Sequence, residues 1–556
     1  MTDVTSTDGS RPHEMRIAVL CVEPPDDSTE SGRLLSGALG TWRVDPLFVP
    51  AGPAEQAESW LITALVPERV GTPEYARRAH TLVQGLIESP GIRAAEADIP
   101  VRAYLGDARH AAPDDGDNSP PGSEAIRWAR DAMRCSEAWA LPSAPGGTSR
   151  GGGIVVGHPD TGYTLHPNLG VGALDLTQDR DFIADDDDAR DPLVPPGLSP
   201  WPLPNPGHGT TTASVLAGRG TEAAGIVGVA PEAIVVPLRT VDSVVQLFDS
   251  DVARSVDYAR GRGCHLVSIS LGGKGFFGLR EAIQRAVDAG IIVIGAAGNN
   301  VGIVVAPASY PNCLAAAATG PDDKPWPESS SGPAVDVSTP GWGVHVAHIS
   351  WRNERPIFDV QQTSGSSYAA AHLAGVAALW LAHHGAAALR ERYGAGLQDV
   401  FLQLLRSGGC RVPVGWDAAN WGAGVVDAAA LLNLPLPSAP DKRHRPVHPA
   451  EPPISRISAL VGIHEGELER LLRRRLGLPD EQLHRTLARF EGELVFHLAQ
   501  DRAFRGFLLG SGTGDPACES NTTGAASSPQ FAAVFLSLPP DGVRHDPAAR
   551  PRPGLA

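Results

Sequence analysis

Short apolar runs alternate with helical stretches through the central part of the chain. The runs are of strand length and rich in Ile, Val and Leu, as strands buried on both faces are. The predicted strands are 154–157, 234–238, 266–271 and 291–295, and the predicted helices include 213–217, 251–260, 279–289 and 368–380. This alternation predicts an α/β fold with a mostly parallel sheet that is covered by helices on both faces. We therefore expect the catalytic groups at the carboxyl ends of the strands.

The regions on either side of this pattern have a different character. Apolar runs at 16–22 and 99–105 flank helical periodicity at 73–88, which predicts a small N-terminal α+β segment. Amphipathic stretches at 467–476 and 480–490 predict a C-terminal helical segment. Stretches rich in Pro, Gly, Ser and Asp separate these parts. The predicted organisation is a disordered tail (1–15), an α+β domain (16–105), a linker (106–124), the α/β domain (125–434), a proline-rich linker (435–453), a helical domain (454–510) and a disordered tail (511–556).

Composition and charge narrow the class of protein. The net charge of −17 argues against a general affinity for nucleic acid or anionic membranes. No run of about eighteen apolar residues occurs, and the polar start lacks the pattern of a secretory signal. We therefore expect a cytoplasmic protein, with non-standard export left open. The six cysteines show no metal-ligand spacing, which predicts buried or idle thiols and no cysteine-bound metal.

Ser367 lies at the predicted start of a strong helix-forming run and follows Gly365 closely. A helix N-terminus carries partial positive charge and free N–H groups, which stabilise an oxyanion that forms beside the serine. Gly365 permits a tight turn without a side chain in the way. The alternative interpretation of Ser367 is a helix-capping serine without chemistry.

His208 and Asp160 are the candidate base and its partner. His208 lies between Gly207 and Gly209, directly before a predicted helix, and histidine has the pKa that a general base needs. Asp160 follows the predicted strand 154–157, where a carboxylate can accept the imidazole N–H. Asp-Thr-Gly also occurs in aspartic proteases, but the second copy that a single-chain enzyme of that class needs is absent.

Asn299 follows the predicted strand 291–295, and its amide can donate to a developing oxyanion. The alternative is an ordinary turn asparagine. The chain order Asp, His, Ser distinguishes these candidates from the trypsin-like and α/β-hydrolase classes and agrees with the subtilisin order.

The residues that carry these signals resemble the motifs of the subtilase family. The resemblance extends over a little more than half of the chain, and the blocks follow one another in the family's order. The matching blocks are Asp160-Thr161-Gly162, Gly207-His208-Gly209-Thr210, Gly228-Val229-Ala230-Pro231, Ser270-Leu271-Gly272-Gly273, Ala297-Gly298-Asn299, Gly365-Ser366-Ser367-Tyr368-Ala369 and Trp421-Gly422-Ala423-Gly424-Val425-Val426-Asp427-Ala428.

The resemblance implies a subtilisin-like three-layer fold and a serine endopeptidase that acts on proteins or peptides. It implies that Ser367 is the nucleophile, His208 the base and Asp160 the partner of that base. Asn299 is then the oxyanion donor. The resemblance further implies that the block 270–273, where strand 266–271 ends, binds the extended substrate through Ser270, Leu271 and Gly272, and that the chemistry needs no cofactor.

Two departures from the family pattern concern His158 and calcium. His158 and Pro159 replace the apolar pair that usually precedes the aspartate, and we interpret His158 as a structural residue close to the surface. Asn168 occupies a position that often ligates calcium as aspartate in this family. The acidic run 185–188 offers carboxylates for a structural calcium, but a solvated loop is the favoured interpretation.

Three functional alternatives stay open at this point. The chain can be a catalytically silent subtilase that serves as a binding scaffold, although all four candidate catalytic residues are present. Residues 16–105 resemble either an inhibitory propeptide or a permanent ancillary domain. Residues 454–510 are either a helical adaptor that recruits a protein partner or a small domain that packs on the catalytic core.

Overall fold

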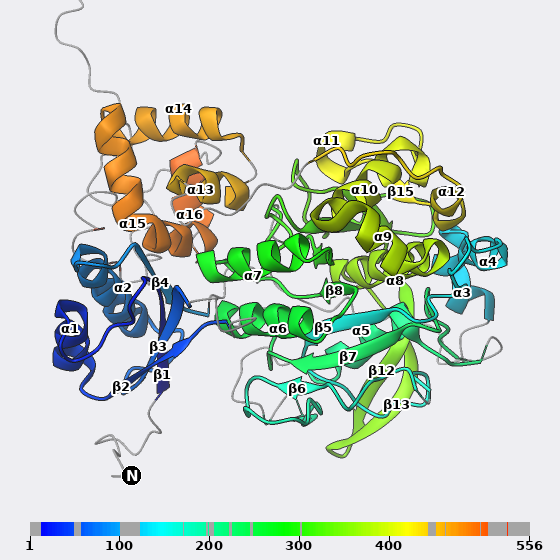
Figure 1. Cartoon of the computed structure of the whole chain (residues 1–556), viewed down its shortest axis with the longest axis horizontal. Helices are drawn as coiled ribbons and strands as arrows, with labels where there is room; N and C mark the ends of the chain where they lie inside the picture. The colour runs from blue at the N-terminus through cyan, green and yellow to red at the C-terminus, as the bar shows by residue number, and fades with distance from the viewer. Residues whose placement is uncertain are drawn as a thin grey trace, which may run out of the picture.

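The protein is described by a computed structural model in which three parts lie side by side (Figure 1). The structure describes residues 13–48, 57–100, 123–170, 172–195, 198, 205–221, 225–244, 248–300, 303–442, 452–461, 463–500, 502–509, 527 and 531. Among these residues, no helix combines the length and apolar character that crossing a bilayer requires.

Within the described residues, the central sheet has nine strands, and most of them are parallel. The strands are β5 (Val155–Asp160), β6 (Arg180–Asp181), β7 (Ile234–Arg239), β8 (Leu266–Ile269), β9 (Ile292–Ala296), β10 (Leu314–Thr319), β11 (Val337–Pro340), β14 (Cys410–Arg411) and β15 (Val425–Val426). Their order is β14-β15-β11-β10-β9-β8-β5-β7-β6, and only β14 with β15 is antiparallel. The four strands predicted from the sequence are β5, β7, β8 and β9. Their carboxyl ends therefore meet at one edge of the sheet.

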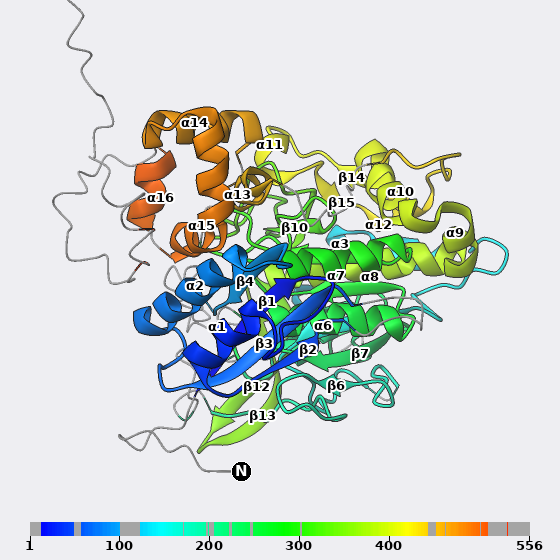
Figure 2. The ribbon, with the colours of Figure 1, turned by 60° about the vertical axis from the view of Figure 1, so that its left-hand side comes forward.

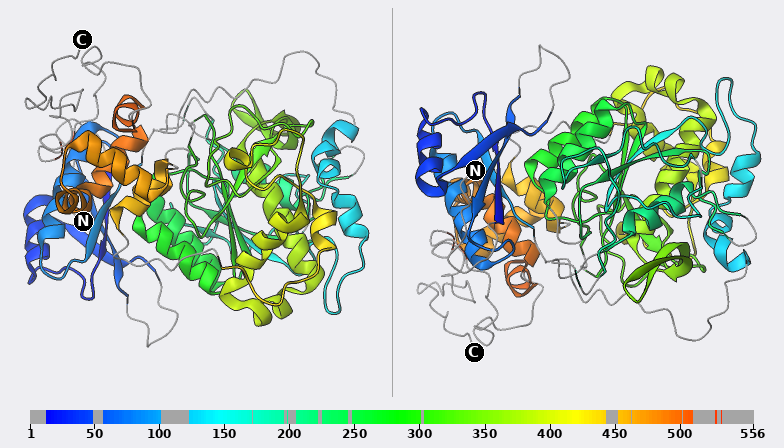
Figure 3. Two further views of the ribbon diagram at one scale, coloured as in Figure 1. Left: turned by 90° about the horizontal axis from the view of Figure 1, so that it is seen from above. Right: turned by 90° about the horizontal axis from the view of Figure 1, so that it is seen from below.

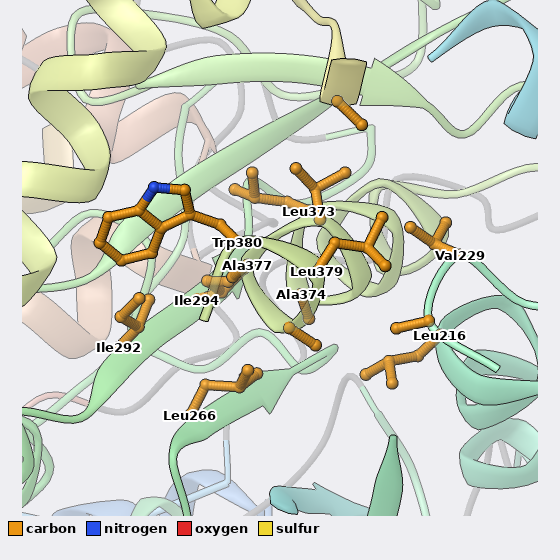
Figure 4. Packing of buried hydrophobic residues seen from close by; sticks show 14 of the residues in the cluster. Leu216, Val229, Leu266, Ile292, Ile294, Leu373, Ala374, Ala377, Leu379 and Trp380 are labelled. Atoms are coloured by element: carbon orange, nitrogen blue, oxygen red, sulfur yellow. The ribbon is translucent and has the colours of Figure 1, made fainter. Parts of the chain in front are cut away.

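Helices cover both faces of this sheet. On one face lie α5 (His208–Ala217) and α8 (Ser366–His384), and on the other lie α6 (Asp249–Gly261) and α7 (Phe277–Asp288). Helix α8 is apolar on all sides, as a helix surrounded by protein should be. Its Leu373, Ala377 and Trp380 pack over Ile292 and Ile294 of the sheet (Figure 4). The result is the three-layer α/β arrangement expected from the sequence.

Shorter elements surround these layers. They are α3 (Ser123–Ala132), α4 (Cys135–Ala140), α9 (Ala386–Tyr393), a 3₁₀ turn (Gly394–Gly396), α10 (Leu397–Leu404), a π-helical turn (Leu405–Gly409), α11 (Ala418–Trp421) and α12 (Ala428–Leu432). A hairpin of β12 (Val344–Arg352) and β13 (Arg355–Thr363) forms a separate two-stranded sheet. Its two-residue turn holds Asn353 and Glu354 at φ 49° and 61°, the left-handed geometry of tight hairpins.

The N-terminal part is an antiparallel sheet with two helices. Its elements are β1 (His13–Leu20), α1 (Glu30–Leu39), β2 (Trp42–Pro46), β3 (Ser59–Val66), α2 (Pro73–Glu88) and β4 (Ala94–Asp98), with the strand order β2-β3-β1-β4. The predicted helix 73–88 coincides with α2, which Thr72 caps by accepting from Tyr75 N at 3.4 Å. This part lies against α6 and α7, and Ala18, Leu47 and Leu61 join the core beneath them (Figure 2).

Two predictions for this part were wrong. The strand expected at 99–105 is instead β4, which ends at Asp98; Ile99 and Pro100 lie beyond it, and 101–105 fall outside the described residues. Pairing with β1 selects 94–98, although its sequence, Ala-Ala-Glu-Ala-Asp, carries little strand propensity. In addition, β1 begins at His13, inside the stretch expected to be a tail.

In the C-terminal part, the described residues form four helices, which lie together with the N-terminal part on one side of the α/β domain (Figure 3). They are α13 (Pro453–Val461), α14 (Glu465–Leu476), α15 (Asp480–Gln500) and α16 (Arg502–Leu509). Phe531 falls in the segment predicted to be a disordered tail, yet it is buried against the rings of Phe490 and His497, at centroid distances of 6.0 and 4.7 Å. Apolar burial overrides the polar composition of its neighbours.

The described cysteines form no disulfide. Cys21, Cys135, Cys264 and Cys313 are buried, and Cys410 is half-buried. Burial raises the pKa of the thiols of Cys21, Cys135, Cys264 and Cys410, which keeps them protonated and unreactive.

Candidate active site

Asp160 and His208 form a buried pair where β5 ends and α5 begins. Asp160 is 0% exposed, and its Oδ1 lies 2.7 Å from Nδ1 of His208. The same oxygen accepts from Thr161 N at 2.7 Å. A carboxylate on Nδ1 requires the proton there, so Nε2 of the neutral imidazole is left as the base. Burial alone would raise the pKa of Asp160, but His208 and the hydrogen bonds hold it below its usual value, so the carboxylate stays ionised.

The glycines beside His208 are required by close packing, as the sequence suggests. Gly207 has φ 83°, and a Cβ there would lie 2.4 Å from Cδ1 of Ile349. A Cβ at Gly209 would lie 2.2 Å from the carbonyl oxygen of Gly162. The start of α5 therefore fits tightly against the loop that follows Asp160, and this contact sets the position of the imidazole.

Ser367 is the second residue of α8, as predicted. Its side chain is 8% exposed, and its hydroxyl donates to the carbonyl oxygen of Ser270 at 3.2 Å. Ser270 Oγ donates in return to Ser367 O at 2.9 Å. The ring of the next residue, Tyr368, lies 6.5 Å from the ring of His208, which brings the start of α8 to the Asp160–His208 pair.

Asn299 is fixed against the start of α8. Its Oδ1 accepts from Ser366 N at 2.9 Å, and Ser366 Oγ accepts from Gly298 N at 3.0 Å. Because the amide oxygen is engaged, Nδ2 is the donor left for a substrate oxygen. Gly365 lies beside this amide, since a Cβ there would lie 3.8 Å from Nδ2. The N–H of Ser367 lies in the first helical turn and has no intrahelical acceptor.

The substitution Asn299→Ala tests the prediction that Asn299 donates a hydrogen bond to the oxyanion. If Asn299 is the oxyanion donor, kcat should fall about 10²–10³-fold while KM changes little, because such an amide stabilises charge that exists only in the transition state. Steady-state kinetics on a peptide substrate provide the measurement. Asn420→Ala, at an exposed asparagine on α11, is the control and should keep full activity. A loss confined to KM would contradict the oxyanion role.

The predicted substrate-binding residues directly follow β8. The side chain of Leu271 is buried in the core, so only its backbone can meet a substrate. Gly272 N donates to Val244 O at 3.3 Å, and a Cβ at Gly272 would lie 2.8 Å from Val305. The amide of Gly272 is thus engaged within the protein, while the role of Ser270, Leu271 and Gly272 in substrate binding stays a prediction.

Sequence reasoning missed two features of the site. Asp191 is buried and joins the loop after Asp160 to the start of α5, since its Oδ2 accepts from Thr161 Oγ1 at 2.8 Å and from Gly207 N at 2.7 Å. No spacing in the sequence distinguishes it from its acidic neighbours. The placement of His158 near the surface was wrong: it lies inside β5 and is 2% exposed. Its strand extends three residues further than the apolar run predicted.

The described residues contain no group of three or more His, Cys, Asp or Glu side chains that could hold a metal ion. Arg180 binds two carboxylates of the acidic run, Asp185 and Asp187, the latter at 2.9 Å. Asn168 Oδ1 accepts from Ile226 N at 2.8 Å and so closes a loop. Calcium binding therefore receives no support from these two places.

Comparison with known proteins places this geometry in a family. The sequence profile of the Subtilase family matches residues 151–399, which include Asp160, His208, Asn299 and Ser367. Thermitase of Thermoactinomyces vulgaris is 32% identical over 263 residues, or 47% of this chain and 83% of thermitase. The chain belongs to the subtilase family. It is a subtilisin-like serine endopeptidase, a hydrolase whose substrates are proteins or peptides.

Two further proteins are similar to the chain, one in sequence and one in fold. An extracellular protease of Xanthomonas campestris pv. campestris is 28% identical over 428 residues, covering 69% of this chain and 67% of that protein. The crystal structure of fervidolysin from Fervidobacterium pennivorans, an enzyme related to subtilisin, matches with a TM-score of 0.52 and 21% identity over 77% of this chain and 62% of that chain. This second likeness shows that the subtilisin-like fold is shared.

Proposed function

We propose that Asp160, His208 and Ser367 are the catalytic triad of this subtilase and that Asn299 is its oxyanion donor. The observation that carries the proposal is the 2.7 Å contact between Asp160 Oδ1 and His208 Nδ1, close to the first turn of α8. An oriented base next to a serine at a helix N-terminus is what serine nucleophilic catalysis needs.

The mechanism follows from the positions of these groups. A substrate carbonyl that enters next to Ser367 is attacked by Oγ as Nε2 of His208 takes the hydroxyl proton. Asp160 holds the imidazolium that results. The tetrahedral oxyanion accepts hydrogen bonds from Asn299 Nδ2 and from the N–H of Ser367. His208 then gives its proton to the leaving amine as the C–N bond breaks.

An acyl-enzyme on Ser367 remains after this first half of the reaction. Water attacks the ester carbonyl, and His208 Nε2 accepts the proton of that water. The second tetrahedral adduct collapses, the Ser367 Oγ–C bond breaks, and His208 returns the proton to Oγ. The carboxylic acid product is then released, and the free hydroxyl of Ser367 is restored.

A chromogenic ester tests the acyl-enzyme directly. We expect a pre-steady-state burst of about one alcohol per chain, because the first half of the reaction outruns hydrolysis of the ester intermediate. The burst should vanish in His208→Ala. Cleavage of a peptide library by the same preparation establishes the endopeptidase activity in parallel. A strictly linear ester trace from a preparation that cleaves peptides would contradict a covalent intermediate on Ser367.

We also propose that the N-terminal and C-terminal parts act as one unit that stays on the catalytic domain. One hydrophobic cluster contains Leu82 and Leu86 of α2 together with Leu487 and Leu494 of α15. Gln84 Nε2 donates to the carbonyl oxygen of Arg489 at 2.6 Å. The apolar face of the C-terminal helices is thus already covered, which favours a packing role over the recruitment of a separate partner.

Charged groups of this unit bind the N-termini of two catalytic-domain helices. Asp98 accepts from Asp249 N and Ser250 N at 3.0 Å each, at the start of α6. Glu96 accepts from Phe277 N at 3.1 Å, at the start of α7. A carboxylate at a helix N-terminus satisfies free N–H groups and complements the helix dipole.

Glu96 also joins the three parts of the chain. Its carboxylate lies 3.4 Å from Lys274 of the catalytic domain and forms a hydrogen bond with Arg456 of α13. Arg456 in turn lies 3.1 Å from Glu491 of α15. Burial alone would raise the pKa of Glu96, but Arg456 and Lys274 hold it below its usual value, so it remains ionised.

The substitution Arg456→Met tests this docking. We expect the backbone amides of Asp249, Ser250 and Phe277 to exchange with deuterium at least about tenfold faster. The reason is that the buried carboxylate of Glu96 loses its main cation, the guanidinium of residue 456. Mass-spectrometric hydrogen exchange on the full chain provides the measurement. Arg474→Met, at an exposed arginine of α14, is the control and should leave exchange unchanged. Equal exchange in both variants would contradict the proposed docking.

A further inference from the structure

Two buried polar side chains outside the proposed triad lie on the far side of Asp160 from His208. His158 is 2% exposed and precedes Asp160 by two residues on β5, so both side chains point to the same face of the sheet. Thr212 is 0% exposed and follows His208 by one turn of α5, on the same face of the helix. The four groups therefore meet in one layer between β5 and α5.

The distances connect these groups into a chain. His158 Nε2 lies 2.9 Å from Thr212 Oγ1 and 3.3 Å from the carbonyl oxygen of Gly209. A carbonyl can only accept, so Nε2 of His158 carries the proton and donates. Burial lowers the pKa of His158 despite the nearby Asp160, which keeps the ring neutral and able to hold this tautomer.

The hydroxyl of Thr212 in turn lies within hydrogen-bond distance of Asp160. Its oxygen lies 3.3 Å from Asp160 Oδ2, and it is also near the carbonyl oxygens of His208 and Gly209, at 3.0 and 3.2 Å. An ionised carboxylate is the strongest of these acceptors. His158 itself stays 3.8 Å from Asp160 Oδ2, too far for a direct hydrogen bond.

The two oxygens of Asp160 thus have different partners. Oδ1 accepts from His208 Nδ1 and Thr161 N, and Oδ2 has Thr212 as its side-chain donor. A buried carboxylate oxygen that lacks a donor costs free energy. The carboxylate group could then rotate, and this rotation would move Oδ1 away from His208. The Thr212 hydroxyl, itself held by His158, removes this freedom.

We propose that His158 and Thr212 are positioning residues which, through the hydrogen-bond chain from His158 Nε2 by way of Thr212 Oγ1 to Asp160 Oδ2, fix the carboxylate of Asp160 and so the orientation and basicity of His208. This inference rests on the triad assignment proposed above. The other titratable groups that face this cluster are Tyr368 of α8 and Asp191, which reaches it through Thr161.

The substitution Thr212→Val removes the hydroxyl and keeps the shape of the side chain. Without this donor, the negative charge of Asp160 concentrates on the oxygen that faces the imidazole and favours the imidazolium. We expect kcat to fall about tenfold with KM nearly unchanged, and the acid limb of the kcat/KM profile to move up by about 0.5 pH unit. Thr212→Ser keeps the donor and should restore both quantities.

A second pair of variants tests the other end of the chain. His158→Leu removes the donor to Thr212, whereas His158→Gln places an amide N–H near the position of Nε2. The leucine variant should shift kcat and the acid limb in the same direction as Thr212→Val, and the glutamine variant should recover most of the loss. The double variant His158→Leu/Thr212→Val should be no worse than Thr212→Val alone, because both changes break one chain.

Active-site titration with a fluorophosphonate normalises all rates, so that misfolded protein does not count as slow enzyme. If either Thr212→Val or His158→Leu loses stability but keeps the wild-type kcat per titrated site and the wild-type pH profile, these residues only fill the core and the inference is overturned. A wild-type chain that reacts at a residue other than Ser367 would instead overturn the triad assignment, and this inference with it.

Discussion

Replacement of Ser367 by alanine is expected to abolish peptide hydrolysis, with a loss of about 10⁶-fold in kcat, the size found when a related triad protease loses its serine. The structure explains why no neighbour can compensate. Ser367 is the second residue of α8, with its hydroxyl at the end of β8 and its N–H in the first helical turn. A nucleophile elsewhere would be displaced from both the base and the oxyanion donors, and displacement by an ångström costs orders of magnitude.

The neighbouring serine provides a matched control for this prediction. Ser366 Oγ accepts from Gly298 N and therefore serves the loop that carries Asn299. Ser366→Ala should lower kcat by no more than about tenfold, through slight loosening of that loop. Steady-state rates on one peptide substrate, together with thermal unfolding of each variant, separate chemistry from folding. The assignment of Ser367 as the nucleophile is wrong if the Ser366→Ala variant is inactive and the Ser367→Ala variant is active.

The substitution Asp160→Asn is expected to lower kcat by about 10⁴-fold, as the loss of the triad aspartate does in related chemistry. The carboxylate accepts from three donors, Thr161 N, His208 Nδ1 and Thr212 Oγ1. Asparagine has one oxygen and one NH₂ group in place of the two carboxylate oxygens. At least one of the three donors then meets the NH₂ group, which cannot accept its hydrogen bond. The imidazolium of the transition state also loses its buried counter-charge.

Asp191→Asn is the control for the second prediction. Asp191 is a buried carboxylate of the same region, but it accepts from Thr161 Oγ1 and Gly207 N and does not contact the imidazole. We expect its replacement to lower stability and to reduce kcat by about tenfold at most. Comparable losses for the two variants, measured as kcat per titrated active site, would mean that Asp160 only supports the loop.

The sequence predicts where the candidate residues lie in the fold because its signals are local. Each of the four central strands is a short apolar run, and each candidate residue follows a strand or precedes a helix where glycine allows close packing. Gly207 and Gly209 show why such motifs are informative, since any side chain at either position would collide with a neighbouring segment. A helix start can likewise be read from one stretch of sequence, as for α2 behind Thr72 and Pro73.

Other features depend on contacts that a single segment does not record. A histidine near the end of a strand looks the same in sequence whether it is exposed or buried, and only the approach of α5 decides that His158 is covered. The amphipathic pattern of α14 and α15 predicts a buried face but not that α2 covers it. The β12–β13 hairpin turns at Asn353-Glu354, a much weaker turn signal than Asn-Gly.

The most direct test of the triad is to map where a fluorophosphonate binds. The reagent phosphonylates only a serine that an oriented base activates, and peptide mass spectrometry identifies the residue. We predict one phosphonate per active chain, on Ser367, with labelling abolished in His208→Ala and retained in Ser366→Ala. Labelling of a different residue, or a chain that hydrolyses peptides while Ser367 stays unmodified, would contradict the catalytic site described for this subtilase.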